Sequence, residues 1–262
     1  MGDSNEPILK VKDLGVVFND IKLGLIALES ITFDVKESEF VSIIGPSGCG
    51  KSTLFKLLAD LIDSDGINAG ISGNIEVLGH SPEYARKNRK LGVVFQKPTL
   101  LEWRDIRSNV ALPLEIMRVN RSEIKQRVDE LLAMVGLESY GSFRPSQLSG
   151  GMQQRISIAR ALAYDPDILL MDEPFSALDE IKRREMNDSL LRIWKQTGKT
   201  ILFVTHSIQE AVYLSERIIV LSERPGKVKD ILEIPMKYPR DKYLDSDQYF
   251  DLQNKVRHAL SK

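Results

Sequence analysis

The chain has 262 residues, of which 42% are apolar and 28% charged, and its formal net charge is −1. These values are ordinary for a globular protein with a substantial core, and they exclude a whole-chain charge bias toward nucleic acid or anionic lipid. The single cysteine, Cys49, excludes an intrachain disulfide and a cysteine-based zinc site.

Short apolar runs and one glycine-rich turn fill the first quarter of the chain. The runs Ile8–Val11, Gly15–Phe18 and Ile31–Val35 precede any helical pattern, which predicts a group of antiparallel strands. The run Phe40–Ile44 predicts a buried strand, and a helix is expected from about Lys51 to Ala59.

The middle of the chain is helical in pattern. Apolar residues in Arg121–Val135 share one helical face, and Gly136 follows as a stop signal. Because no strand pattern occurs between about residues 98 and 163, we expect a helical lobe inserted into an α/β core.

Strand patterns then return at Ile168–Asp172, Thr200–Thr205 and Arg217–Leu221, with a helix over Asp179–Gln196. The predicted organisation is one domain, 1–240, with its core at about 1–97 and 164–240 and the lobe at about 98–163. A helical tail at 241–262 is expected to pack on that core.

The ends of the chain and its apolar runs bear on location. The segment 1–10 is polar and lacks the apolar centre of a signal peptide. No run approaches the roughly 20 apolar residues that a membrane helix needs. We therefore expect a cytoplasmic protein that does not itself cross a membrane.

A phosphate-binding motif connects the buried strand at 40–44 to the following helix. Its residues are Gly45, Pro46, Ser47, Gly48, Cys49, Gly50, Lys51, Ser52 and Thr53. The glycines let backbone N–H groups converge on a phosphate chain, and the helix adds its positive N-terminal end. We expect Lys51 to reach the β- and γ-phosphates of ATP and the Ser52 hydroxyl to bind Mg²⁺. A glycine-rich turn that binds nothing is the alternative, and the flanking elements argue against it.

Two acids end the strand at 168–172. Asp172 is expected to hold Mg²⁺ through water, and Glu173 to act as the general base that polarises the attacking water. Adjacent acids at a strand end are commonly solvated turn residues. The phosphate motif in the same chain favours the catalytic interpretation.

The segment Leu148-Ser-Gly-Gly-Met-Gln-Gln-Arg155 resembles the signature motif of the ATP-binding cassette (ABC) family. Ser149, Gly150 and Gly151 open a predicted helix that ends near Ala163, which makes a second anion-binding N-terminus. The resemblance implies that the signature of one subunit covers the ATP held by another copy. It also implies a P-loop NTPase (RecA-like) core with an N-terminal antiparallel β subdomain and an inserted helical signature subdomain.

Four further positions take their roles from the same resemblance. Gln96 resembles the Q-loop glutamine, which contacts Mg²⁺ and the attacking water. Asp179 lies in a D-loop-like segment that crosses the dimer interface, and His206 resembles the switch histidine at the γ-phosphate. Phe18 stands where the family places an aromatic that stacks on adenine, although an aromatic in an edge strand is also a common core residue.

Several segments resemble the importer ATPases of the nitrate/sulfonate/taurine group, among them Leu100-Leu-Glu-Trp-Arg104 and Ser222-Glu-Arg-Pro-Gly-Lys227. The resemblance implies two permease subunits in the membrane and, indirectly, a solute-binding protein. It places the chain on the inner face of the cell membrane, with no nucleic-acid partner. Ala59-Asp60-Leu61 departs from the usual Ala-Gly-Leu, and the stretch 62–73 is unusually long.

The apolar residues after Gln96 allow two interpretations. Leu100, Leu101 and Trp103 either fill the core of the helical lobe or form a docking surface for a partner helix, with Trp103 as the preferred contact.

Other functions within the family are weighed against transport. Chromosome-organising members carry a long coiled coil, and translation factors carry two cassettes; this chain has neither feature. An ATPase of an assembly pathway and an exporter ATPase remain alternatives.

Overall fold

The computed structural model describes residues 6–18, 24–62 and 69–261. The chain divides into two compact units, one formed by residues 1–88 and 200–262 and the other by residues 89–199. None of the helices among the described residues is both long enough and apolar enough to cross a bilayer.

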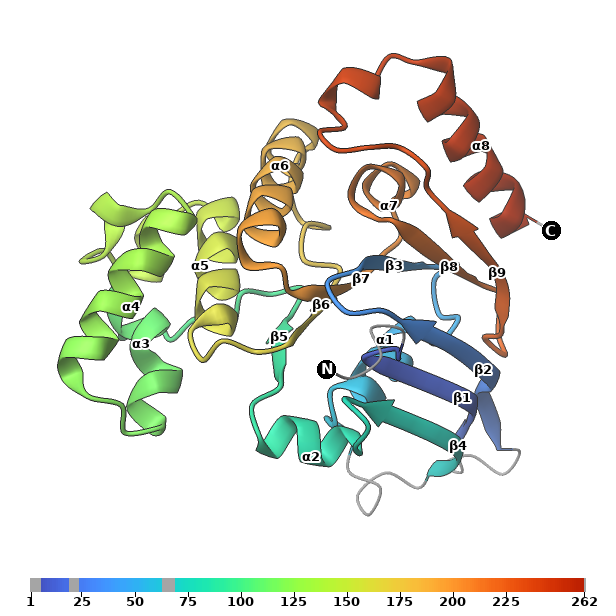
Figure 1. Ribbon diagram of the computed structural model, residues 1–262, viewed down its shortest axis with the longest axis horizontal. Helices are drawn as coiled ribbons and strands as arrows, with labels where there is room; N and C mark the ends of the chain where they lie inside the picture. The colour runs from blue at the N-terminus through green and yellow to red at the C-terminus, as the bar shows by residue number, and fades with distance from the viewer. Residues whose placement is uncertain (1–5, 19–23, 63–68, 262) are drawn as a thin grey trace. The chain divides into compact units, whose positions relative to one another are not determined.

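The first unit contains an antiparallel sheet of order β2-β1-β4 (Figure 1), as the sequence predicts for its opening strands. Its strands are β1 (Leu9–Phe18), β2 (Leu25–Val35) and β4 (Ala69–Val77). The two strands expected at 8–11 and 15–18 are wrong as separate elements, because β1 runs through both. Asp13 lies between them with φ 49°, and the register with β4 shifts between Lys12 and Gly15. A bulge therefore interrupts the alternation of side chains without ending the strand.

The same unit contains four strands in the order β7-β3-β8-β9. The strands are β3 (Phe40–Ile44), β7 (Thr200–Thr205), β8 (Arg217–Leu221) and β9 (Val228–Glu233), and the helices are α1 (Lys51–Leu58), α2 (Pro82–Lys87), α7 (Ile208–Leu214) and α8 (Asp247–Ser261). Strand β3 pairs in parallel with β7 and β8, and β9 is antiparallel to β8. Every residue of β3 is buried, which is why its sequence is apolar except for Ser42.

The C-terminal segment packs within the first unit. Helix α8 lies against α7, β8 and β9 (Figure 1), with Tyr249, Leu252 and Val256 buried. Arg240, just before it, is 1% exposed and donates hydrogen bonds to backbone carbonyls that include those of Val212 and Ser215.

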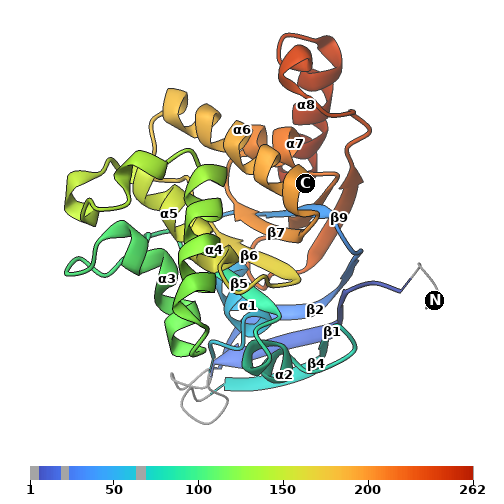
Figure 2. The same cartoon turned by 60° about the vertical axis from the view of Figure 1, so that its left-hand side comes forward.

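The second unit consists of a parallel strand pair and helices α3 to α6 (Figure 2). Its elements are β5 (Leu91–Val94), α3 (Ile106–Ile116), α4 (Arg121–Met134), α5 (Gly150–Leu162), β6 (Ile168–Asp172) and α6 (Glu180–Thr197). No strand occurs between residues 98 and 163, all of which are described, as the sequence predicts. Gly136 and Gly198 follow α4 and α6 with φ of 68° and 62°, the left-handed conformation that ends a helix.

Asp60 and residues 69–73 belong to the described part of the unusual stretch at 60–73. Asp60, which replaces the usual glycine, has φ 52° and pairs with Arg86 at 2.7 Å between Nε and Oδ2. Residues 70–73 are exposed, as expected, yet they belong to β4, which the sequence analysis missed. Asp63 and Asp65 lie outside the described residues.

Candidate functional site

The phosphate motif begins where β3 ends. Gly50 is the N-cap of α1 with φ 105°, and a Cβ there would lie 2.5 Å from the Leu28 side chain. Only glycine fits both the conformation and the space. Lys51 is 6% exposed, and its Nζ donates to the carbonyls of Gly45 at 2.7 Å and Pro46 at 2.9 Å. The Lys51 side chain therefore lies against the loop with which it is expected to bind phosphate.

The remaining positions of this motif differ in exposure. Ser47, Gly48 and Ser52 are exposed, Thr53 is half-buried, and Cys49 is buried as a free thiol. Ser52 lies in the first turn of α1, where backbone N–H groups are not used within the helix. The loop thus presents donors and a hydroxyl to solvent at one helix end.

Two other predicted positions lie in the first unit. His206 is exposed and follows β7 directly, at the carboxyl end of a strand parallel to β3. The Thr205 hydroxyl donates to the buried Glu210 carboxylate, and Ser207 caps α7, which fixes the backbone on both sides of the histidine. Phe18 is the half-buried last residue of β1 and pairs with Leu25 and Ala69.

The acidic pair ends β6 in the second unit. Asp172 and Glu173 are both half-buried, and Glu173 has φ 44°. A non-glycine residue in this region is strained by about 1–3 kcal/mol.

Hydrogen bonds bring Gln96 and the acidic turn together within this unit. The Gln96 side-chain amide donates to Ser176 Oγ at 2.9 Å, and that hydroxyl donates to the Glu173 carbonyl at 3.0 Å. Asp179 caps α6, and the backbone N–H of Lys182, together with its side chain, holds the pKa of this carboxyl below its usual value. Ser176, which connects Gln96 to Glu173, was not among the predicted site residues.

The segment after Gln96 is anchored to α5. Gln154 donates to the Phe95 carbonyl at 3.0 Å. The Arg160 guanidinium donates to the Pro98 and Thr99 carbonyls at 3.0 and 2.9 Å, and burial lowers its pKa. Thr99 has φ 48°, so a strained residue is held by the helix that carries the signature motif.

The signature motif opens α5. The Ser149 hydroxyl caps the helix by accepting from Met152 N at 3.4 Å, and Ser149 and Gly150 are exposed. A Cβ added at Gly150 or Gly151 would meet only ordinary contacts, at 3.9 Å from Leu178. Packing within the unit therefore does not require these two glycines.

Trp103 is 74% exposed, which bears on the two interpretations of its segment. The core interpretation is wrong for this residue. Leu100 and Leu101 are half-buried.

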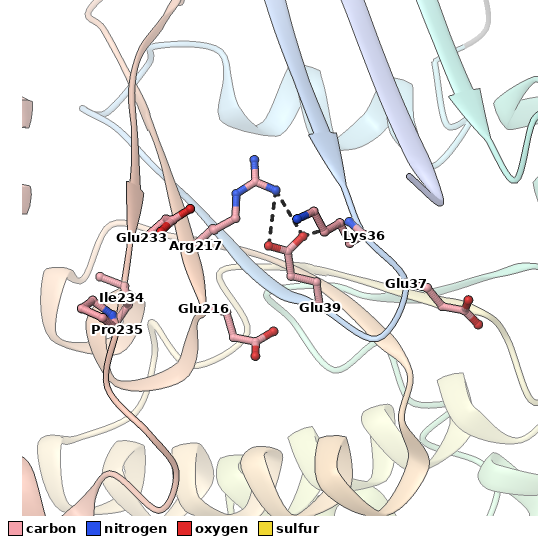
Figure 3. Close-up of a pocket in the computed structure, with 8 residues that line it drawn as sticks. All are labelled: Lys36, Glu37, Glu39, Glu216, Arg217, Glu233, Ile234 and Pro235. Carbon is pink, nitrogen blue, oxygen red and sulfur yellow. Dashed lines mark hydrogen bonds and ion pairs between the residues drawn. The ribbon is translucent and has the colours of Figure 1, made fainter. Parts of the chain in front are cut away.

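A cavity of about 330 Å³ lies at the opposite end of β3 from the phosphate motif (Figure 3). Arg217 Nη1 donates to both Glu39 oxygens at 3.3 Å, and this ion pair connects the start of β8 to the segment before β3. Glu216 also lines the cavity, and burial raises the pKa of its carboxyl. None of the predicted site residues lines this cavity.

A glycine-rich loop between a buried strand and a helix, together with a buried strand that ends in two carboxylates, defines a nucleotide-binding protein of the P-loop class. A family model described as "ABC transporter" matches residues 28–176. The chain belongs to the ABC transporter family, and it is an ATPase.

Named relatives cover most of the chain. An uncharacterized ABC transporter ATP-binding protein of Methanocaldococcus jannaschii is 42% identical over 96% of this chain and 91% of its own length. A taurine import ATP-binding protein of Jannaschia sp. is 42% identical over 84% of this chain and 78% of its own length. An aliphatic sulfonates import ATP-binding protein of Bacillus cereus is 41% identical over 87% of this chain and 86% of its own length.

A solved structure gives the same fold. It is a dimeric, post-hydrolysis state of an ATP-binding cassette bound to ADP and Pi, 33% identical, with a TM-score of 0.73. The match covers 87% of this chain and 100% of that one.

Proposed function

We propose that this chain is the ATP-hydrolysing subunit of a binding-protein-dependent importer for a small solute of the taurine and sulfonate type. Two copies are proposed to close head to tail around two ATP molecules, on the inner face of the membrane and beneath permease subunits. The names of the taurine and sulfonate relatives support the solute class.

The observation that carries the proposed dimer is the exposed start of α5. No contact within the unit requires glycine at Gly150 or Gly151, because an added Cβ would meet only ordinary contacts. Their absent side chains leave room for a ligand at a capped, positively polarised helix end. The phosphate motif already supplies one such end, so a second suits the ATP held by another copy.

The proposed roles follow the chemistry of each group. The loop from Gly45 to Thr53 binds the phosphates, with Lys51 at the β- and γ-phosphates. Glu173 accepts the proton of the attacking water, His206 contacts the γ-phosphate, and Phe18 stacks on adenine. Asp179 contributes to the surface between the copies.

The donor set also fits Mg²⁺. A hydroxyl at Ser52, an amide oxygen at Gln96 and a carboxylate at Asp172 are hard oxygen ligands, the kind that Mg²⁺ prefers. When bound, the ion would neutralise charge on the β- and γ-phosphates. The protein's own part is to hold these three side chains.

Two variants test the hydrolytic roles. Glu173→Gln is expected to leave ATP binding near normal and to lower turnover by about 10²–10⁴-fold, the scale of lost acid–base assistance. Lys51→Ala is expected to weaken nucleotide binding itself. Turnover at the wild-type rate in Glu173→Gln would remove the base assignment.

The same Glu173→Gln variant tests the dimer. Sedimentation should show a dimer with Mg²⁺ and ATP and a monomer after the nucleotide is removed. Adding Ser149→Arg should abolish the dimer and preserve ATP binding by the monomer. The same oligomeric state with and without ATP would contradict the head-to-tail arrangement.

A further inference from the structure

The loop that connects β8 to β9, residues Ser222–Lys227, is closed by its own hydrogen bonds. Ser222 N donates to the Lys227 carbonyl at 2.9 Å, and Lys227 N donates to Ser222 Oγ at 3.0 Å. Ser222 Oγ donates in turn to the Pro225 carbonyl at 3.0 Å. The loop is thus a preformed turn.

This turn packs directly on the phosphate motif and on β2. A Cβ at Gly226 would lie 2.1 Å from the Cys49 carbonyl oxygen, so only glycine permits the approach. Gly226 N donates to the Ala27 carbonyl, and Glu29 N donates to the Gly226 carbonyl, each at 3.0 Å. An ion pair of 2.9 Å between Lys227 and Glu29 adds to the attachment.

Arg224 extends from the turn to the phosphate motif. Its Nε and Nη2 both donate to the Gly48 carbonyl oxygen, at 3.2 and 2.9 Å. Gly48 has φ 76° and is exposed. A glycine loses the most conformational freedom of any residue when it is fixed, and binding a phosphate chain requires that it be fixed.

The bond to Gly48 acts on the peptide that follows. Because the peptide unit is planar, holding the Gly48 carbonyl also sets the direction of the Cys49 N–H. Backbone N–H groups of this motif are the expected phosphate donors. A guanidinium at this position also adds positive charge next to a site for polyanions.

We propose that Arg224 is a positioning residue that holds the phosphate-binding loop in its binding conformation through the Gly48 carbonyl. The proposal rests on the proposed ATP site at residues 45–53. It assigns a role to the Ser222–Lys227 segment, whose partner the sequence does not reveal.

The test compares Arg224→Ala with Arg224→Lys in the full chain. The control, Lys237→Ala, removes an equal charge from an exposed position of the same unit. Arg224→Ala should weaken Mg-ATP binding, measured by calorimetry, by about fivefold to tenfold, the scale of one charge-assisted hydrogen bond at an exposed site. The KM for ATP should rise with the dissociation constant while kcat changes less than about twofold, and Arg224→Lys should recover part of the affinity.

Thermal melts separate positioning from stability. Arg224 is exposed, so the melting temperatures of the variants and the wild type should agree to within a few degrees. The affinity of Arg224→Ala for Mg-ATP should nevertheless differ from that of the wild type. If Arg224→Ala binds Mg-ATP as tightly as Lys237→Ala does, while Lys51→Ala still weakens binding, the proposal is overturned. If Lys51→Ala also binds normally, the ATP site itself is wrong and the proposed role of Arg224 falls with it.

Discussion

Trp103→Ala tests whether the exposed segment after Gln96 is the contact with the permease. Trp103 is 74% exposed, so about a quarter of its surface, roughly 60 Å², is covered in the free chain. At about 25 cal/mol per Å², truncation removes at most about 1.5 kcal/mol of stability. A buried tryptophan would instead cost about 3–5 kcal/mol.

The expected melting shift of the isolated variant is therefore about 3–6 °C at most for a chain of this size. Its basal ATPase rate should stay near that of the wild type. Binding to the permease should weaken by about 30-fold, the equivalent of roughly 2 kcal/mol for a tryptophan anchor, and ATP hydrolysis should lose its coupling to solute uptake.

The matched control is Phe250→Ala, which removes an aromatic that is 51% exposed on α8. Affinity for permease subunits in detergent and a thermal melt of each free variant are the two measurements. If both variants bind the permease equally well, Trp103 is not the anchor and the docking surface lies elsewhere.

Further predictions follow from the signature glycine and from the buried arginine. Gly150→Ala should leave the melting temperature of the isolated chain unchanged or slightly raised, because a Cβ has room at this position. In the Glu173→Gln background the same change should prevent the ATP-dependent dimer. Normal dimers on sedimentation would contradict the proposed role of this glycine. Arg240→Met should lower the melting temperature by about 6 °C or more, because roughly 3 kcal/mol is lost when several buried carbonyls lose their donor. Arg257→Met, on an exposed face of α8, is its control, and equal melting of the two variants would refute the argument.

The elements that the sequence predicts well are those whose burial is continuous. Strands β3 and β7 are buried at every position, so each is dominated by apolar residues, with a serine inside β3 and threonines at the two ends of β7. Helices α4 and α6 are long enough to show a helical period and end at glycines in the left-handed conformation. In both cases the signal lies within the segment itself.

The elements that were missed depend on their neighbours. Strand β4 has no buried residue before Val77, and β9 has none, so neither shows an apolar run. Their main-chain hydrogen bonds to β1 and β8 make them strands, and such bonds leave little trace in side-chain pattern. Helices α2 and α7 span 6 and 7 residues, which is less than two helical turns in each case. Such short helices do not show a helical period in their sequence.

The residues of the candidate site also fall into those that their own sequence motif reveals and those that only the fold reveals. Motif spacing predicts which residues supply donors and acids, because those residues are close in sequence. It does not predict that Gln96 bonds Ser176, 80 residues away, or that Arg224 bonds Gly48, 176 residues away. The Arg-Pro-Gly sequence indicates a turn, but only the fold shows what the turn touches.

The glycines of the two helix starts that we propose to bind phosphate differ in what requires them. At Gly50 the fold itself forbids a side chain, because Leu28 and the backbone of Ala27 occupy the space that a Cβ would need. At Gly150 the fold permits one, since the nearest atom to an added Cβ is 3.9 Å away. Packing within the unit therefore does not account for Gly150, and an exposed, capped helix start is suited to an anion. Packing within one copy of the protein therefore accounts for Gly50, and we propose that a phosphate presented by another copy accounts for Gly150.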